Sequence, residues 1–209
     1  MTQTECTMEL KQDSKGLKFK IENLRRYNLQ KKPYIPLQSL FQLISQEAIQ
    51  KELRKANINA GFWWEITEEV LKRGWRIFAV LVLVEQVRLV KPFREMAFLQ
   101  DDRLPLEPWN LKDLKDYDST WALHFYNKQW EVLAPYFSRG TISRSIDSKI
   151  ALPFVEDKRI GGGGFGEVYE VSIDQKHQHL RDVFSQQVST PSSSQRDRVG
   201  DGTNSCHRL

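Results

Sequence analysis

The sequence predicts an α+β protein in which a mainly helical module is followed by a glycine-rich β-hairpin and a disordered tail. Apolar residues recur at helical spacing across residues 34–138. Over residues 150–180 the pattern changes to strand, glycine turn and strand. Residues 181–209 are rich in Ser, Gln, Arg and Asp, and they contain too few apolar side chains to offset the entropy lost on ordering.

The composition is that of a protein with a packed core. Of the 209 residues, 40% are hydrophobic and 28% are charged. The formal net charge of +4 is mild, so nucleic acid is not an expected partner. Cys6 and Cys206 lie near opposite ends of the chain and form no disulfide framework. This favours an intracellular location, cytoplasmic or nuclear.

Neither a membrane span nor a signal peptide is expected. The most apolar run, Ile77–Val84, has eight residues, whereas a transmembrane helix needs about 20. The first residues, MTQTECTMELKQD, lack the apolar stretch of a signal peptide. We therefore expect Ile77–Val84 to be a buried core element.

Residues 1–33 are expected to form a basic, partly disordered leader. Between Lys15 and Lys32, seven lysines and arginines accompany a single acid, Glu22. A short basic cluster of this kind is typical of a solvated segment. The folded part is therefore expected to begin at Tyr34.

Two helices are expected in the first half of the helical module. Residues 34–55 have apolar side chains at helical spacing, and Pro36 lies where a helix begins. Residues 62–73 follow the same period, and Gly74 is expected to end that helix. Trp63 and Trp64 are interpreted as core anchors.

Two further helices are expected in its second half. Residues 75–84 are rich in β-branched side chains and would suit a buried strand, but residues 76–91 lack a turn signal, which favours a buried helix. Residues 119–134 are expected to form the last helix, with Asp118 or Ser119 as its N-cap.

The segment RIGGGGFGEVYEVSI holds five of the chain's 11 glycines. A P-loop would require Lys and Ser or Thr after Gly166, but Glu167 and Val168 occupy those positions. A dinucleotide-binding fold requires a helix directly after the glycines. Residues 168–173 instead alternate at period two and are rich in strand formers. Both alternatives are therefore excluded.

Strand, glycine turn and strand is the arrangement of the nucleotide-binding loop of protein kinases, G-x-G-x-x-G-x-V. Ile160 precedes the first glycine and Phe165 precedes the third. Val168 and Tyr169 follow at the spacing of the kinase pattern. With these flanking residues, IGGGGFGEVY is a specific signal rather than an accidental glycine cluster.

The stretch LPFVEDKRIGGGGFGEVYEVSIDQKHQHL resembles the start of the kinase domain in a large group of fungal serine/threonine protein kinases. Upstream, FYNKQWEVLAPYF and RIFAVLVLVE are similar to the helical region of that family. The resemblance implies an ATP site in which glycine amides cover the phosphates, Phe165 caps the loop tip, and Ile160 and Val168 sandwich the adenine. The residues it assigns to ATP are Ile160, Gly161, Gly163, Gly164, Phe165, Gly166 and Val168.

The parts of a kinase that carry out phosphoryl transfer are missing from the sequence. Transfer needs a strand lysine, a catalytic aspartate, and Asp and Asn ligands for magnesium. Their motifs, V-A-x-K, H-R-D and D-F-G, do not occur. We therefore expect a C-terminally truncated, inactive kinase-like protein that holds ATP weakly and lacks magnesium ligands. A lone hairpin is marginal in water, so Phe154, Tyr169 and Val171 are expected to pack on the helical module.

Two other interpretations remain open. In the first, the helical region is a protein–protein interaction module and the hairpin is a relic. The aromatic side chains that would form its binding face are those of Trp63, Trp64, Trp121 and Trp130. In the second, a missed junction near Phe184 makes the written sequence depart from the true gene product, which would continue into the rest of a kinase domain. The pair His177 and His179 has no further ligands nearby in the sequence, so no metal site is expected.

Overall fold

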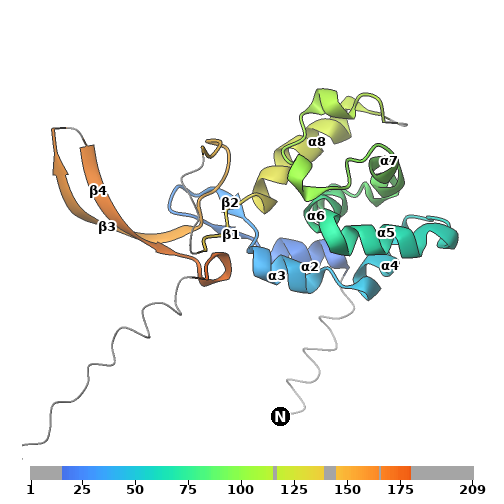
Figure 1. Cartoon of the computed structure of the whole chain (residues 1–209), viewed down its shortest axis with the longest axis horizontal. Helices are drawn as coiled ribbons and strands as arrows, with labels where there is room; N and C mark the ends of the chain where they lie inside the picture. The colour runs from blue at the N-terminus through green and yellow to red at the C-terminus, as the bar shows by residue number, and fades with distance from the viewer. Residues whose placement is uncertain (1–15, 115–116, 139–144, 165, 180–209) are drawn as a thin grey trace, which may run out of the picture. The chain divides into compact units, whose positions relative to one another are not determined.

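The computed structural model describes residues 16–114, 117–138, 145–164 and 166–179 (Figure 1). These residues form a mixture of helices and two small antiparallel sheets, so the chain is of the α+β class. The predicted tail, residues 181–209, lies outside the described residues.

The folded part begins well before residue 34. Helix α2 (Leu17–Asn23) buries Leu17 and Ile21 in the main core. Strand β1 (Arg26–Tyr27) then pairs with β2 (Pro33–Tyr34) in an antiparallel ladder. The predicted leader is therefore wrong over its second half. Among its basic residues, the apolar Leu17 and Ile21 lie four positions apart, which is the spacing of one helical face.

The first predicted helix is two helices. Helix α3 (Leu37–Leu43) ends before Ser45, and α4 (Gln46–Lys55) begins after it. The Ser45 hydroxyl accepts a hydrogen bond from the Ala48 N–H, which is the geometry of an N-cap. The break therefore has a local cause that the apolar periodicity alone does not reveal.

The second predicted helix does not stop at Gly74. Helix α5 (Trp63–Glu69) continues through a π-helical turn, Val70–Gly74, into α6 (Trp75–Leu83). A Cβ on Gly74 would lie 2.8 Å from the Leu99 carbonyl oxygen. Gly74 is therefore required for close packing rather than as a helix terminator.

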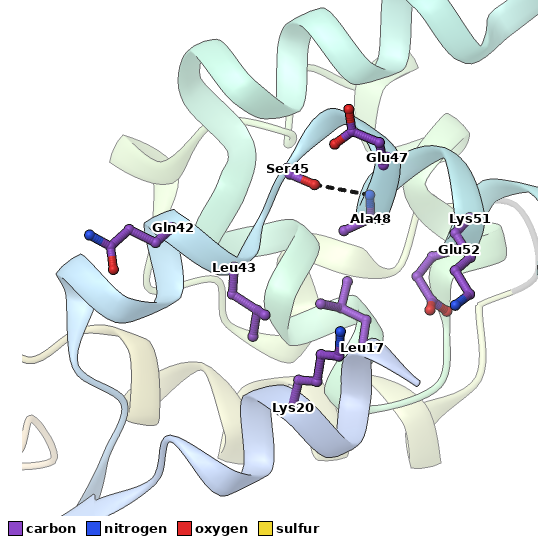
Figure 2. A pocket seen from close by; sticks show the side chains of 9 residues that line it. All are labelled: Leu17, Lys20, Gln42, Leu43, Ser45, Glu47, Ala48, Lys51 and Glu52. Carbon is purple, nitrogen blue, oxygen red and sulfur yellow. Dashed lines mark hydrogen bonds between the residues drawn. The ribbon is translucent and has the colours of Figure 1, made fainter. Parts of the chain in front are cut away.

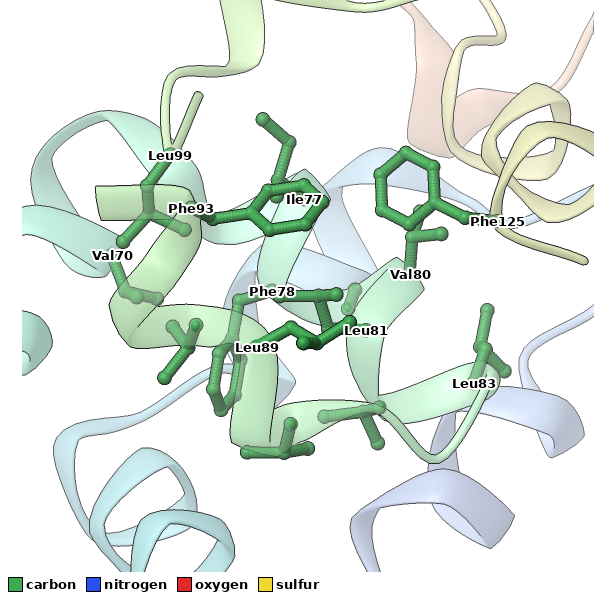
Figure 3. Packing of buried hydrophobic residues seen from close by; sticks show 14 of the residues in the cluster. Val70, Ile77, Phe78, Val80, Leu81, Leu83, Leu89, Phe93, Leu99 and Phe125 are labelled. Carbon is green, nitrogen blue, oxygen red and sulfur yellow. The ribbon is translucent and has the colours of Figure 1, made fainter. Parts of the chain in front are cut away.

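Helix α6 confirms the prediction of a buried helix at residues 75–84. Every residue from Ile77 to Leu83 is buried, as Figure 3 shows for several of them. The chain then turns at Glu85, whose positive φ of 59° marks a left-handed turn that the sequence analysis missed. No helix in the described part of the chain is both long and apolar enough to cross a membrane.

The last helix is close to the prediction. After α7 (Val90–Glu95), helix α8 (Ser119–Gln129) starts at Asp118, whose carboxylate accepts hydrogen bonds from the Thr120 and Trp121 N–H groups. A 3₁₀ turn, Trp130–Val132, extends it. The α8 face meets α7 and α6 in the core, where the rings of Phe93 and Phe125 lie 5.4 Å apart (Figure 3).

Strands β3 (Phe154–Gly163) and β4 (Gly166–Ile173) form the predicted hairpin. Both faces of the hairpin are open to solvent along most of its length. Tyr169 and Val171 are 46% and 37% exposed, so the expectation that they pack on the helical module is wrong. Phe154 does make such a contact, with its ring 6.2 Å from that of Phe137.

Candidate functional site

The glycine turn joins two strands that stay paired up to its edge. Gly161 pairs with Val168, Gly162 with Glu167, and Gly163 with Gly166. Gly164 lies in the turn, and Phe165, which was predicted to cap the loop tip, lies outside the described residues. The predicted glycines are therefore brought together at the end of the hairpin, with no helix after them.

A β-bulge lies next to this turn. Arg159 pairs with Tyr169 and the next pair is Gly161 with Val168, so Ile160 is an extra residue on β3. Ile160 lies directly before Gly161, the partner of Val168, and so beside the glycines. These two aliphatic side chains are 60% and 56% exposed. The two residues expected to bind adenine therefore lie on neighbouring strands near the glycines, and both are exposed.

The backbone around the turn is open. A Cβ added to Gly161, Gly163 or Gly164 would meet no atom within 4 Å. Gly166 has a φ of +145°, which residues with a side chain rarely adopt. The side-chain positions of Gly161, Gly163 and Gly164 therefore face open space, and Gly166 has a conformational reason to be glycine.

Three side chains are linked on one face of the hairpin beside the turn. The Arg159 Nε lies 2.9 Å from Glu167 Oε1, and the Tyr169 hydroxyl donates to Glu167 Oε2 at 2.5 Å. That hydrogen bond raises the pKa of Tyr169 above its usual value. An Arg159 Nη lies 2.8 Å from where a Cβ on Gly162 would be. The guanidinium therefore lies across the glycine backbone.

A buried carboxylate holds the base of the hairpin. Asp174 follows β4 directly, and its Oδ2 accepts hydrogen bonds from Arg26 and Tyr34, each at 2.8 Å. Its Oδ1 accepts from the Lys176 N–H. Burial opposes ionisation, but these bonds and the Arg26 charge hold the pKa of Asp174 below its usual value. The hairpin is thereby joined to the β1–β2 ladder.

His177 completes this attachment. Its Nδ1–H donates to the Pro135 carbonyl and its Nε2 accepts from the Leu37 N–H, at 3.0 and 3.3 Å. Burial lowers the pKa of His177, although the Pro135 hydrogen bond acts in the opposite direction. Both ring nitrogens are used, so His177 cannot pair with His179 on a metal. Within the described ranges, no group of three or more His, Cys, Asp or Glu side chains could hold a metal ion.

A separate cavity of about 350 Å³ lies beside α2, α3 and α4 (Figure 2). Leu17 and Leu43 form part of its apolar wall, and Lys20, Glu47 and Lys51 lie around it. Charges of both signs therefore surround it, and none of its lining residues belongs to the hairpin. It is a second place at which a small molecule can be sought.

Sequence reasoning identified the glycines and their aliphatic neighbours but missed the polar groups around them. Arg159 and Glu167 are eight residues apart, and only the strand register makes them neighbours. Asp174 and His177 lie in a polar stretch without a distinctive motif. The Asp-x-Lys turn, in which the Asp174 carboxylate accepts from the Lys176 N–H, is the one local signal that marks them.

Comparisons with protein-family models, with curated proteins and with solved structures found no match to this chain. The functional interpretation therefore depends on the residues and geometry of the hairpin.

Proposed function

We propose that the β3–β4 hairpin is a nucleotide-binding loop of the protein-kinase type and that its ligand is ATP. One observation carries the proposal: an open glycine turn between paired strands lies next to the exposed aliphatic pair Ile160 and Val168. The resemblance of the surrounding sequence to fungal serine/threonine kinases supports the same assignment. The kinase N-lobe as a fold belongs to this proposal too.

The ligand class follows from what the two parts of the site can contact. Backbone N–H groups in a glycine turn are suited to anions because no Cβ keeps the anion away. Covering exposed aliphatic side chains with a flat apolar group is favourable, because it removes apolar surface from water. A molecule with a polyphosphate at one end and an aromatic base at the other fits both parts, and ATP is such a molecule.

The chain in hand is proposed to bind ATP weakly and to transfer no phosphate. Positioning and charge stabilisation supply most of the catalysis in phosphoryl transfer. The sequence lacks the V-A-x-K, H-R-D and D-F-G motifs that provide them. A single exposed hairpin covers a nucleotide from one side only, so most of the ligand stays in water.

Calorimetric titration with ATP, with and without magnesium, tests this function. A Cβ at Gly161 or Gly163 would meet no protein atom within 4 Å, so Gly161→Val and Gly163→Val place their side chains on the open face of the turn, where they should obstruct the ligand. Gly16→Ala, outside the hairpin, is the control. We expect ATP affinity to fall in both valine variants and to persist in the control. Equal affinity in all four proteins would contradict the proposal.

A second candidate function is partner binding by the helical part. Of the tryptophans expected to form a binding face, Trp121 and Trp130 are buried, so that face does not exist as predicted. Trp64, a member of the predicted face, is 67% exposed, so its interpretation as a core anchor is wrong. Trp109 is 62% exposed, and exposed tryptophans are frequent anchors in interfaces. Partner capture by the whole chain that is lost in Trp64→Ser or Trp109→Ser would support this function. Capture that depends only on Gly161 and Gly163 would contradict it.

A further inference from the structure

We propose that Arg159 contacts the phosphates of the bound ligand and that Glu167 competes for it, so that the two residues form a latch across the glycine turn. This inference depends on the proposed nucleotide-binding function and adds a charged residue to a site that otherwise consists of backbone and aliphatic groups. It names a determinant of phosphate affinity that the glycine pattern does not contain.

The position of Arg159 is the first step. Its Nη lies 2.8 Å from the place of a Cβ on Gly162, so the guanidinium lies over the glycine backbone. A phosphate that approaches the amides of this turn therefore comes within reach of the guanidinium. Arginine binds phosphate through two parallel N–H groups, which makes it well suited to this contact.

The strength of the Arg159–Glu167 pair is the second step. The two side chains are 59% and 53% exposed, and their atoms meet at 2.9 Å. An ion pair this exposed contributes little because water and salt screen it. A polyphosphate carries more negative charge than one carboxylate, so it can displace Glu167 from the guanidinium.

The position of Tyr169 is the third step. Its hydroxyl donates to the second carboxylate oxygen of Glu167, the one that Arg159 Nε does not contact. Glu167 thus keeps a hydrogen-bond partner after Arg159 turns to the phosphate. The carboxylate stays on its own strand and does not follow the guanidinium toward the ligand.

A matched pair of charges lies on the other face of the same hairpin. Lys158 pairs with Glu170 across the two strands. Because successive strand residues point to opposite faces, Lys158 and Glu170 project away from the face of Arg159 and Glu167. They have the same charges on the same two strands, so they separate a specific contact from a general effect of net charge.

The test measures affinity for ATP, inorganic tripolyphosphate and adenosine in five proteins. These are the unsubstituted protein, Arg159→Gln, Glu167→Gln, and the controls Lys158→Gln and Glu170→Gln. We expect Arg159→Gln to weaken ATP and tripolyphosphate binding about five-fold or more and Glu167→Gln to strengthen it about two- to five-fold, in line with the worth of an exposed charge pair. Adenosine affinity should not change, and each control should shift ATP affinity less than two-fold.

The outcomes separate the latch from the function on which it depends. If the unsubstituted protein binds neither ATP nor tripolyphosphate, the nucleotide function and the latch both fail. If it binds ATP but Arg159→Gln behaves like Lys158→Gln, the latch alone is wrong. A fall in adenosine affinity in Arg159→Gln equal to the fall for ATP would also contradict the latch, because it would indicate a distorted hairpin.

Discussion

Replacing Asp174 by alanine should detach the β3–β4 hairpin from the helical part of the protein while leaving the helices folded. Asp174 is 4% exposed and is the common acceptor for Arg26, Tyr34 and the Lys176 N–H. Its removal takes away all three bonds at once. The residues of the strands are unchanged, but a detached hairpin is only marginally stable in water, so its strands should open more often.

The free-energy cost of Asp174→Ala follows from what happens to each of the three hydrogen-bond donors. The Tyr34 hydroxyl is fully buried, so the loss of its acceptor costs about 1–3 kcal/mol. The Lys176 N–H lies in a turn, and the loss of its acceptor adds about 1 kcal/mol. The Arg26 side chain is 53% exposed and can turn to water, so its share is small. The total is about 2–4 kcal/mol.

Hydrogen–deuterium exchange is the assay, with the amides of β3 and β4 compared with those of α8 as an internal reference. A loss of about 2–4 kcal/mol corresponds to hairpin exchange about 30- to 1000-fold faster. Adding Tyr34→Phe to Asp174→Ala removes the orphaned hydroxyl and should recover about 1 kcal/mol. Unchanged hairpin exchange, or equal acceleration in α8, would refute this reasoning.

Three other predictions concern the same fold. Burial lowers the pKa of His177, so the contribution of the neutral ring to stability is present above about pH 6.5 and is lost at lower pH. Urea titrations between pH 7.5 and 5 should show this fall in the free energy of unfolding. The fall should be smaller in His177→Gln. Burial raises the pKa of Asp101 to about 6, so ionising it costs stability as the pH rises from about 4 to 6. Asp101→Asn still offers an acceptor to the Ile77 N–H, so it should raise the free energy of unfolding by about 1–2 kcal/mol at pH 8 and by less at pH 5; a loss at pH 8 would contradict this. Gly74→Ala should destabilise the protein by about 2 kcal/mol or more, because its Cβ meets the Leu99 backbone, whereas Gly164→Ala, which meets nothing, should leave thermal stability nearly unchanged.

The elements that sequence predicted well are those whose signal is local. The α8 N-cap at Asp118, the buried run at Ile77 and the period-two strand after Gly166 each depend on neighbours within a few residues. Capping and strand alternation act at that range. These features could therefore be located before any tertiary contact was known.

The elements that sequence missed depend on contacts between distant residues. Gly74 was predicted to end a helix, because the sequence does not reveal that the Leu99 carbonyl packs against it. Residues 17–23 were predicted to belong to a basic leader, because the sequence does not reveal that Ile21 is buried in the core. Arg159 and Glu167 become a pair only through the bulged register of the hairpin. Such information is tertiary, and composition does not contain it.

Amide NMR during titration with ATP tests the central claim most directly, because it reports where the nucleotide binds. We predict that the largest chemical-shift changes fall on the amides of Gly161, Gly163, Gly166 and Val168. The ATP affinity obtained from them should fall as salt is added. The residues around the cavity beside α2 and α4 should not respond. Shifts confined to that cavity, or none at the glycine turn at saturating ATP, would contradict the assignment of this hairpin as a nucleotide-binding loop.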